Sequence, residues 1–181
     1  MIEKCDTYII DFQGEPIVTK FEFLKALAIA RVYGFKEYEK ALTFIKLNYS
    51  STIEGKEAER ILDDVLPTVK NDRFLKNDLS DNYKIVYQFD TVSNSDIDSQ
   101  ITSLKKYIDK VDYLDLTVSE DFYNNIVTFV VVHGLKSYDG SLGLAERLEN
   151  SIDIQAKSFF VISTDNYKTI QIHKNLDKFE K

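Results

Sequence analysis

The stretch Asn125–Leu135, NIVTFVVVHGL, decides the fold of this chain. Its apolar run is broken only by Thr128, and most of its members are β-branched. The run is too short to span a bilayer, which needs roughly 20 apolar residues. A short, continuous, β-branched run of this kind is typical of a strand that is buried on both faces. We therefore predict a central strand with other elements packed over each side.

The chain around this strand has the composition of a folded protein without a basic surface. It has 181 residues, 44% of them hydrophobic, and a formal net charge of −7. This length fits one domain of moderate size or two small ones. An acidic chain lacks the cationic footprint of a nucleic-acid-binding protein, so we expect no direct nucleic-acid binding.

One cysteine, Cys5, excludes an intrachain disulfide and fits a reducing compartment. The first residues show no basic segment followed by an apolar core, so no secretory signal is expected. We accordingly predict a cytoplasmic protein that does not associate with membranes.

The second half, residues 81–181, alternates between strand and helix patterns. The expected strands and helices are, in order, Tyr83–Asp90, Ile97–Val111, Tyr113–Val118, the Asn125–Leu135 strand, a helix at about Leu142–Asn150, and Ala156–Thr164. This βαββαβ order predicts a ferredoxin-like sheet. Lys168–His173 alternates polar and apolar residues and is expected to add one edge strand.

The first half, residues 1–80, is predicted to be mainly helical. Thr7–Phe12 is rich in β-formers and precedes a Gly-x-Pro turn signal, which predicts a short β-hairpin. Three helices should follow, over Thr19–Tyr33, Lys36–Asn48, and from Ser51 to the stop at Pro67. The fold class is then α+β, a helical half packed with a sheet half, either as one compact unit or as two domains.

The helix expected at Thr19–Tyr33 is apolar on almost every side. Such a helix is either the central core helix of its half or an interface with a partner or a second copy, which would make a homodimer. A helix-turn-helix regulator is a further alternative, because Ala30 and Gly34 have the spacing of that motif. Glu37 and Glu39 oppose it, since they would face the DNA phosphates.

One candidate ligand site lies at the end of the central strand, where His133, Asp139 and Gly140 follow one another closely. A glycine-containing loop between a strand and a helix, here Gly134–Gly143, can present free N–H groups to a ligand. The alternative function is thus a small-molecule sensor or a small enzyme that uses His133. The chain lacks His-x-His and Cys-x-x-Cys spacing, and we predict no metal site, no cofactor and no catalytic residue.

A second candidate surface is acidic. The predicted partner-binding residues are Asp90, Asp96, Asp98, Asp112, Asp115 and Asp121. They could dock a protein or nucleoprotein partner with a basic surface, although charge runs also simply solvate a face.

The function expected from the sequence is that of a non-enzymatic acidic interaction protein that binds and regulates or inhibits a macromolecular partner. Phage-type inhibitors of host defence, such as anti-CRISPR proteins, and immunity proteins have a composition of this style. The expectation depends mainly on the lack of a catalytic signature.

Overall fold

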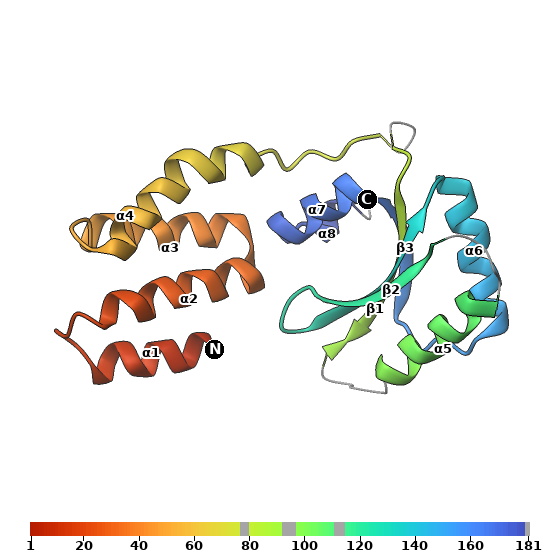
Figure 1. Ribbon diagram of the computed structural model, residues 1–181, viewed down its shortest axis with the longest axis horizontal. Helices are drawn as coiled ribbons and strands as arrows, with labels where there is room; N and C mark the ends of the chain where they lie inside the picture. Colours follow the sequence, from red (N-terminus) through yellow and green to blue (C-terminus); the bar gives the residue numbers. More distant parts are fainter. Residues whose placement is uncertain (77–79, 92–96, 111–114, 180–181) are drawn as a thin grey trace. The chain divides into compact units, whose positions relative to one another are not determined.

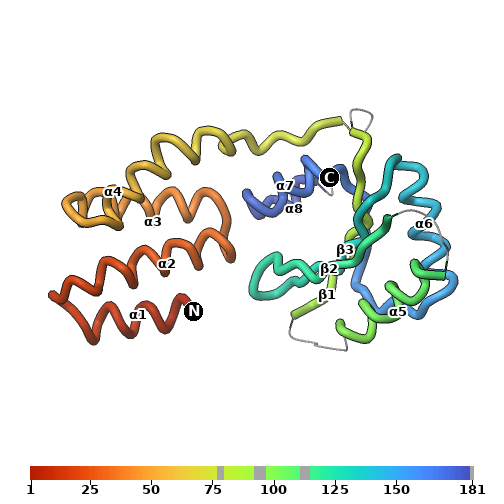
Figure 2. The backbone as a smooth tube through the Cα atoms, viewed as in Figure 1, coloured from red at the N-terminus to blue at the C-terminus, as the bar shows by residue number. Residues whose placement is uncertain are grey.

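The computed structural model describes residues 1–76, 80–91, 97–110 and 115–179, and it is an α+β protein (Figure 1; Figure 2). The chain forms two compact units. The helical unit comprises residues 1–73 together with 169–181, and the sheet unit comprises residues 74–168. Across the described ranges, no helix combines the length and the apolar character that crossing a bilayer requires.

The helical unit is built from short antiparallel helices. These are α1 (Ile2–Asp11), α2 (Val18–Tyr33), α3 (Phe35–Asn48) and α4 (Ile53–Arg60), then a π turn (Ile61–Val65) and a 3₁₀ turn (Leu66–Val69), and later α8 (Leu176–Phe179). Leu42 and Ile45 of α3 pack with Ala26 of α2 and Ala58 of α4 to form the core. Ile172, from the far end of the chain, packs against the same core, so the last segment completes this unit.

The predicted N-terminal hairpin is wrong, because Thr7–Phe12 belongs to α1 and the turn after it. The buried Cys5 and the partly buried Ile2 and Ile9 recur with the spacing of a helix face, whereas Ile10 is 72% exposed. The β-forming residues of this segment led to the strand prediction, although Ile2, Cys5 and Ile9 also satisfy a helical period.

Four strands and two helices make up most of the described part of the sheet unit. They are β1 (Tyr83–Asp90), α5 (Ile97–Lys110), β2 (Thr117–Phe122), β3 (Val127–Leu135), α6 (Tyr138–Ser151) and β4 (Ser158–Ser163). The strand order is β2-β3-β1-β4, and every neighbouring pair is antiparallel. The two central strands are therefore β1 and β3.

The prediction that Asn125–Leu135 contains a strand buried on both faces is confirmed. On one face, Val130 and Val132 pack in a core with Leu104 of α5 and Leu148 of α6, and Figure 1 shows these two helices along the same side of the sheet. On the other face Phe129 is fully buried and stacks on Tyr123 at a ring distance of 4.7 Å. Burial on both sides explains the unbroken apolar run.

The predicted edge strand at Lys168–His173 is wrong, because these residues belong to α7 (Thr164–His173). Tyr167 and Ile170 are both buried and lie three residues apart, which fits a helix. The alternation of Ile170 and Ile172 led to the strand prediction. The second predicted strand of the sheet half, Tyr113–Val118, was placed too early: β2 begins at Thr117, and residues 113–114 lie outside the described part of the chain.

Candidate functional site

Five polar side chains meet on one face of the sheet, where apolar residues would be expected. Lys84 comes from β1, Ser119 and Asp121 from β2, His133 from β3, and Tyr167 from α7. We call these five residues the polar network. All of them belong to the sheet unit, and all except the buried Tyr167 are partly exposed.

An irregularity in the register of β1 and β3 brings Lys84 beside His133. The pairing shifts from Tyr83–Leu135 to Ile85–Val132, so β3 carries one additional residue at this point. A bulge of this kind re-aims a side chain, and bulges are common beside functional sites. Gly134 permits it, because its φ is 94° and a Cβ there would lie 2.7 Å from the Asp115 carbonyl oxygen.

The network is continuous from the lysine to the tyrosine. Lys84 Nζ lies 2.8 Å from His133 Nδ1, and His133 Nε2 lies 2.7 Å from Ser119 Oγ. Ser119 Oγ donates to Asp121 Oδ1 at 2.8 Å. The Tyr167 hydroxyl donates to Asp121 Oδ2 at 2.6 Å. Both oxygens of the carboxylate therefore receive a hydrogen bond, and both imidazole nitrogens have a partner.

The directions of these hydrogen bonds assign the histidine tautomer. An ionised carboxylate only accepts, so the single proton of Ser119 points at Asp121. His133 Nε2 must then donate to the serine oxygen, which leaves Nδ1 as the acceptor for the Lys84 ammonium. The Ser119 proton is thus directed at the carboxylate and not at the imidazole, so this pair lacks the arrangement of a serine nucleophile with a histidine base.

Electrostatics favour the neutral imidazole. Burial lowers the pKa of His133 below its usual value of 6.5, the nearby Lys84 lowers it further, and Asp121 acts in the opposite direction. Burial also lowers the pKa of Lys84, an effect that Asp121 opposes and Lys168 reinforces. Half-buried position, charge neighbours and perturbed pKa values together are typical of functional sites.

The structure brings His133 and Asp121 together, although the sequence assigned them to different sites. Asp139 and Gly140, predicted to join His133, lie instead in the first turn of α6 and are exposed. The expected glycine loop is largely this helix, which begins at Tyr138 and is capped by Ser137, whose Oγ accepts from Gly140 N at 3.2 Å. Among the hydrogen bonds of the described residues, none joins Asp139 or Gly140 to the network.

The predicted acidic surface lies partly within the described residues. Asp90, Asp98 and Asp115 are exposed, whereas Asp96 and Asp112 lie outside the part of the chain that the structure describes. The sheet unit has 15 acidic and 9 basic residues, a net charge of −6, and the helical unit has 15 and 14, a net charge of −1. Nearly all of the net negative charge therefore belongs to the sheet unit.

Sequence reasoning missed Lys84, Ser119 and Tyr167. The lysine offered the best signal, because it interrupts the strongly apolar β1 beside residues that are fully buried. Burying a lysine on a central strand costs free energy unless its ammonium group has a hydrogen-bonding or ionic partner. Its partner could not be identified from the sequence, since His133 becomes adjacent only through the bulge.

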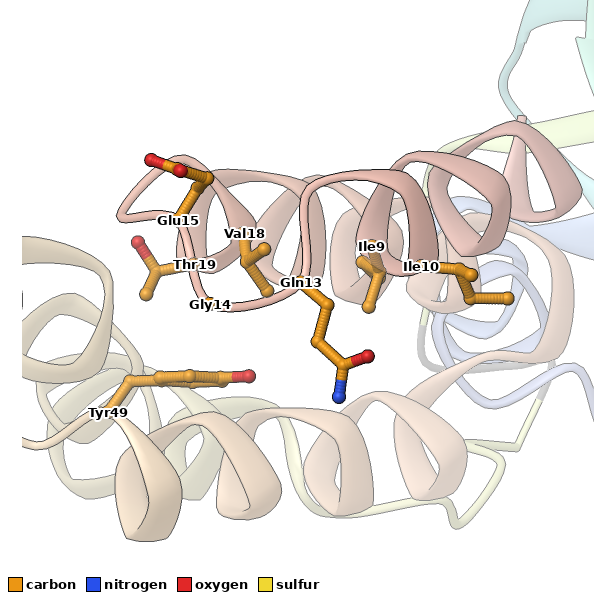
Figure 3. Close-up of a pocket in the computed structure, with 8 residues that line it drawn as sticks. All are labelled: Ile9, Ile10, Gln13, Gly14, Glu15, Val18, Thr19 and Tyr49. Atoms are coloured by element: carbon orange, nitrogen blue, oxygen red, sulfur yellow. The ribbon is translucent and has the colours of Figure 1, made fainter.

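A separate hollow lies in the helical unit, with a volume of about 390 Å³. Figure 3 shows Gln13, Val18 and Thr19 on one side of it and the ring of Tyr49 on the other. The Thr19 hydroxyl lies 2.9 Å from Glu54 Oε2, so this polar group is engaged within the protein. The volume is within the usual range for ligand pockets, and four of the eight lining residues have polar side chains.

The described residues include no group of three or more His, Cys, Asp or Glu side chains arranged to hold a metal ion. The polar network contains only one imidazole and one carboxylate, and each is occupied by its neighbours. Comparison of the chain with protein-family models, curated proteins and solved structures finds no match.

Proposed function

We propose that this chain is a non-enzymatic interaction protein that binds and regulates or inhibits a macromolecular partner. The observation that carries the proposal is an apolar strip on the surface of the helical unit, formed by Tyr8 of α1, Phe12 directly after α1, and the partly buried Phe21 and exposed Leu24 of α2. We call these four residues the apolar strip.

The strip is continuous across the two helices. The ring of Tyr8 lies 5.1 Å from that of Phe21 and 6.4 Å from that of Phe12, and Phe12 lies 6.0 Å from Phe21. Leu24 follows Phe21 by three residues and so is its neighbour on the helix surface. Tyr8, Phe12 and Leu24 are each 43–44% exposed.

Contiguous exposed apolar groups on a soluble surface usually mark a site of protein interaction. Aromatic side chains are the most effective anchors of such interfaces, because they bury a large area with little loss of side-chain entropy. In the described chain the exposed large apolar residues are concentrated in the helical unit, and only Leu75 and Ile126 belong to the sheet unit. This distribution supports the helical unit as the binding surface.

Two features of the sheet unit support the same proposal. Its net charge of −6 and its exposed Asp98 and Asp115 favour a partner that also presents a basic surface. The polar network directs the Ser119 proton to Asp121 rather than to His133, which supports a role without serine-based catalysis.

We further propose that the sheet unit is a ferredoxin-like plait. The supporting observations are the strand-helix-strand-strand-helix-strand order, the spatial order β2-β3-β1-β4, the antiparallel pairing of all neighbours, and the packing of α5 and α6 in one core. Because this architecture serves many unrelated functions, it does not itself identify the partner.

The test is affinity capture with the full chain as bait, followed by mass spectrometry, comparing wild type with Tyr8→Ser/Leu24→Ser. The matched control is Leu47→Ser, which removes an apolar side chain of 74% exposure from α3. We expect a partner that is retained by wild type and by the control and lost by the strip variant. Loss with both variants, or capture that is equal for all three proteins, would contradict the proposal. Light scattering of each variant would show whether a second copy of this chain occupies the strip.

A further inference from the structure

We propose that Lys84 is a nucleophilic lysine that forms an imine with small aldehydes or ketones, with His133 as the base that accepts the proton of its ammonium group. This proposal goes beyond the interaction function and does not depend on it. It assigns a chemical role to the polar network.

The geometry has the parts that an activated nucleophile needs. The Lys84 Nζ lies 2.8 Å from His133 Nδ1, which the hydrogen-bond directions assign as the unprotonated nitrogen. The base is oriented by a third group, because His133 Nε2 lies 2.7 Å from Ser119 Oγ, which in turn donates to Asp121. A nucleophile, a base within hydrogen-bond reach and an orienting group are the general elements of a catalytic triad. Here the amine takes the position of the nucleophile and Ser119 is a positioning residue.

When His133 accepts the proton, both of its nitrogens carry hydrogen, and the imidazolium donates through Ser119 toward the Asp121 carboxylate. The negative charge of Asp121 therefore stabilises the form of His133 that proton transfer produces. Tyr167 keeps this carboxylate in place by its 2.6 Å hydrogen bond.

The charged and titratable groups around Lys84 act in both directions. On α7, Lys168 disfavours the ammonium, whereas the ring of Tyr167, 5.7 Å from Nζ, favours it. Asp121 on β2 also favours the ammonium, and His133 on β3 accepts from it. Burial is the largest influence and lowers the lysine pKa, so the neutral amine forms more readily than on an exposed lysine.

The step is a condensation that needs no oxidant or reductant. The Lys84 ammonium passes a proton to His133 Nδ1, and the freed lone pair attacks the carbonyl carbon. The carbonyl π pair moves to oxygen, and a proton passes from the now cationic nitrogen to this oxygen, which gives a neutral carbinolamine. The His133 imidazolium then protonates the hydroxyl group, which leaves as water while the nitrogen lone pair forms the C=N bond. The product is a protonated imine that links the small molecule to Nζ, with His133 neutral again.

The experiment uses the full chain, a short pulse of propanal and sodium cyanoborohydride, and mass spectrometry of labelling at each lysine between pH 6 and 9. We expect Lys84 to be labelled several-fold faster at pH 7 than the exposed Lys105 of α5. His133→Gln and Ser119→Ala should each reduce labelling of Lys84 several-fold.

Lys174 provides an internal control for the role of the base. Burial, reinforced by Arg31, lowers its pKa to about 8, and its Nζ donates to Gln171 Oε1 at 2.9 Å. Its labelling should therefore be unaffected by the His133 and Ser119 substitutions. Labelling of Lys84 no faster than that of Lys105, or unchanged in both variants, would overturn the proposal. Partner capture by Lys84→Arg tests the interaction function separately, and we expect it to equal that of wild type.

Discussion

Replacing Gly55 by alanine is expected to destabilise the helical unit, although the same change usually stabilises a helix. Gly55 is buried in the first turn of α4, beside the turn that connects α3 to α4. A Cβ at this position would overlap the carbonyl oxygen of Tyr49 and lie 2.6 Å from its carbonyl carbon and 3.0 Å from Ser50 N. These are backbone atoms, so a rotamer change cannot relieve the contact.

Opposing contributions decide whether Gly55→Ala raises or lowers the free energy of unfolding. Alanine in a helix is favoured over glycine by about 1 kcal/mol. Forcing an additional carbon into a packed site costs about 1–3 kcal/mol. Moving Gly55 away from Tyr49 also disturbs the cap of α4, in which Gly55 N donates to Thr52 Oγ1 at 3.0 Å. Losing such a cap costs about 1 kcal/mol. The expected net loss is about 1–3 kcal/mol.

Gly143→Ala is the matched control, because Gly143 is also helical, in α6, and a Cβ there would meet nothing within 4 Å. This change should stabilise its helix by up to about 1 kcal/mol. A single melting temperature is a poor measure for a chain of two compact units. Hydrogen–deuterium exchange with mass spectrometry resolves the free energy of opening for peptides from α4 and α6 separately. The reasoning is refuted if Gly55→Ala leaves α4 as stable as in wild type or more stable.

Three further predictions concern the cores and the polar network. Leu42→Ala should lower the free energy of opening, measured by hydrogen–deuterium exchange of the peptides that contain the substituted element, by about 2–5 kcal/mol, because Leu42 is fully buried. Leu47→Ala should change this free energy by no more than about 0.5 kcal/mol; similar losses for both would contradict the packing. Tyr87→Phe should be neutral or stabilising in the same assay, since the buried Tyr87 hydroxyl has no hydrogen-bond partner among the described residues; a loss above about 1 kcal/mol would show an unrecognised partner. Lys84→Met should raise the pKa of His133, measured by NMR titration of the imidazole, because it removes a neighbouring cation; a lower pKa would refute this. Because the pKa of His133 is lower in the folded state, the unfolded state binds the proton more readily. The contribution of His133 to the free energy of unfolding is therefore fully present above about pH 6.5, and it is lost as the pH falls through the pKa of the folded state.

The elements that the sequence predicted well are those with a long, unambiguous pattern. The apolar run in β3 and the stripe in α5 with Ile97, Leu104 and Ile108 each indicate a single structure, and these residues are buried as expected. The segments α1 and α7 were misassigned because short runs with isoleucine and tyrosine satisfy a strand pattern and a helix pattern equally well. Their contacts with the rest of the chain, which are not local, decided between the two patterns.

The polar network illustrates a second limit. His133 and Asp121 were both recognised as chemically significant, but their connection depends on the pairing of β2 with β3 and on the position of Tyr167 in a helix that had been predicted as a strand. The bulge at Gly134 moves the register by one residue, and such a shift changes which side chains are neighbours. The composition of the sequence and the spacing of its motifs do not reveal this shift in register.

The division of the chain has a consequence for its synthesis. The sheet unit is inserted between two parts of the helical unit. The N-terminal helices therefore leave the ribosome before the segment after residue 168, which completes their core, has been synthesised. That segment supplies Ile172 to their core, and it supplies His173, whose ring lies 5.1 Å from Phe35 and whose Nε2 lies 3.0 Å from the Val69 carbonyl oxygen. During translation the sheet unit can therefore fold first, while the N-terminal helices are held in an incomplete state with apolar surface open to chaperones.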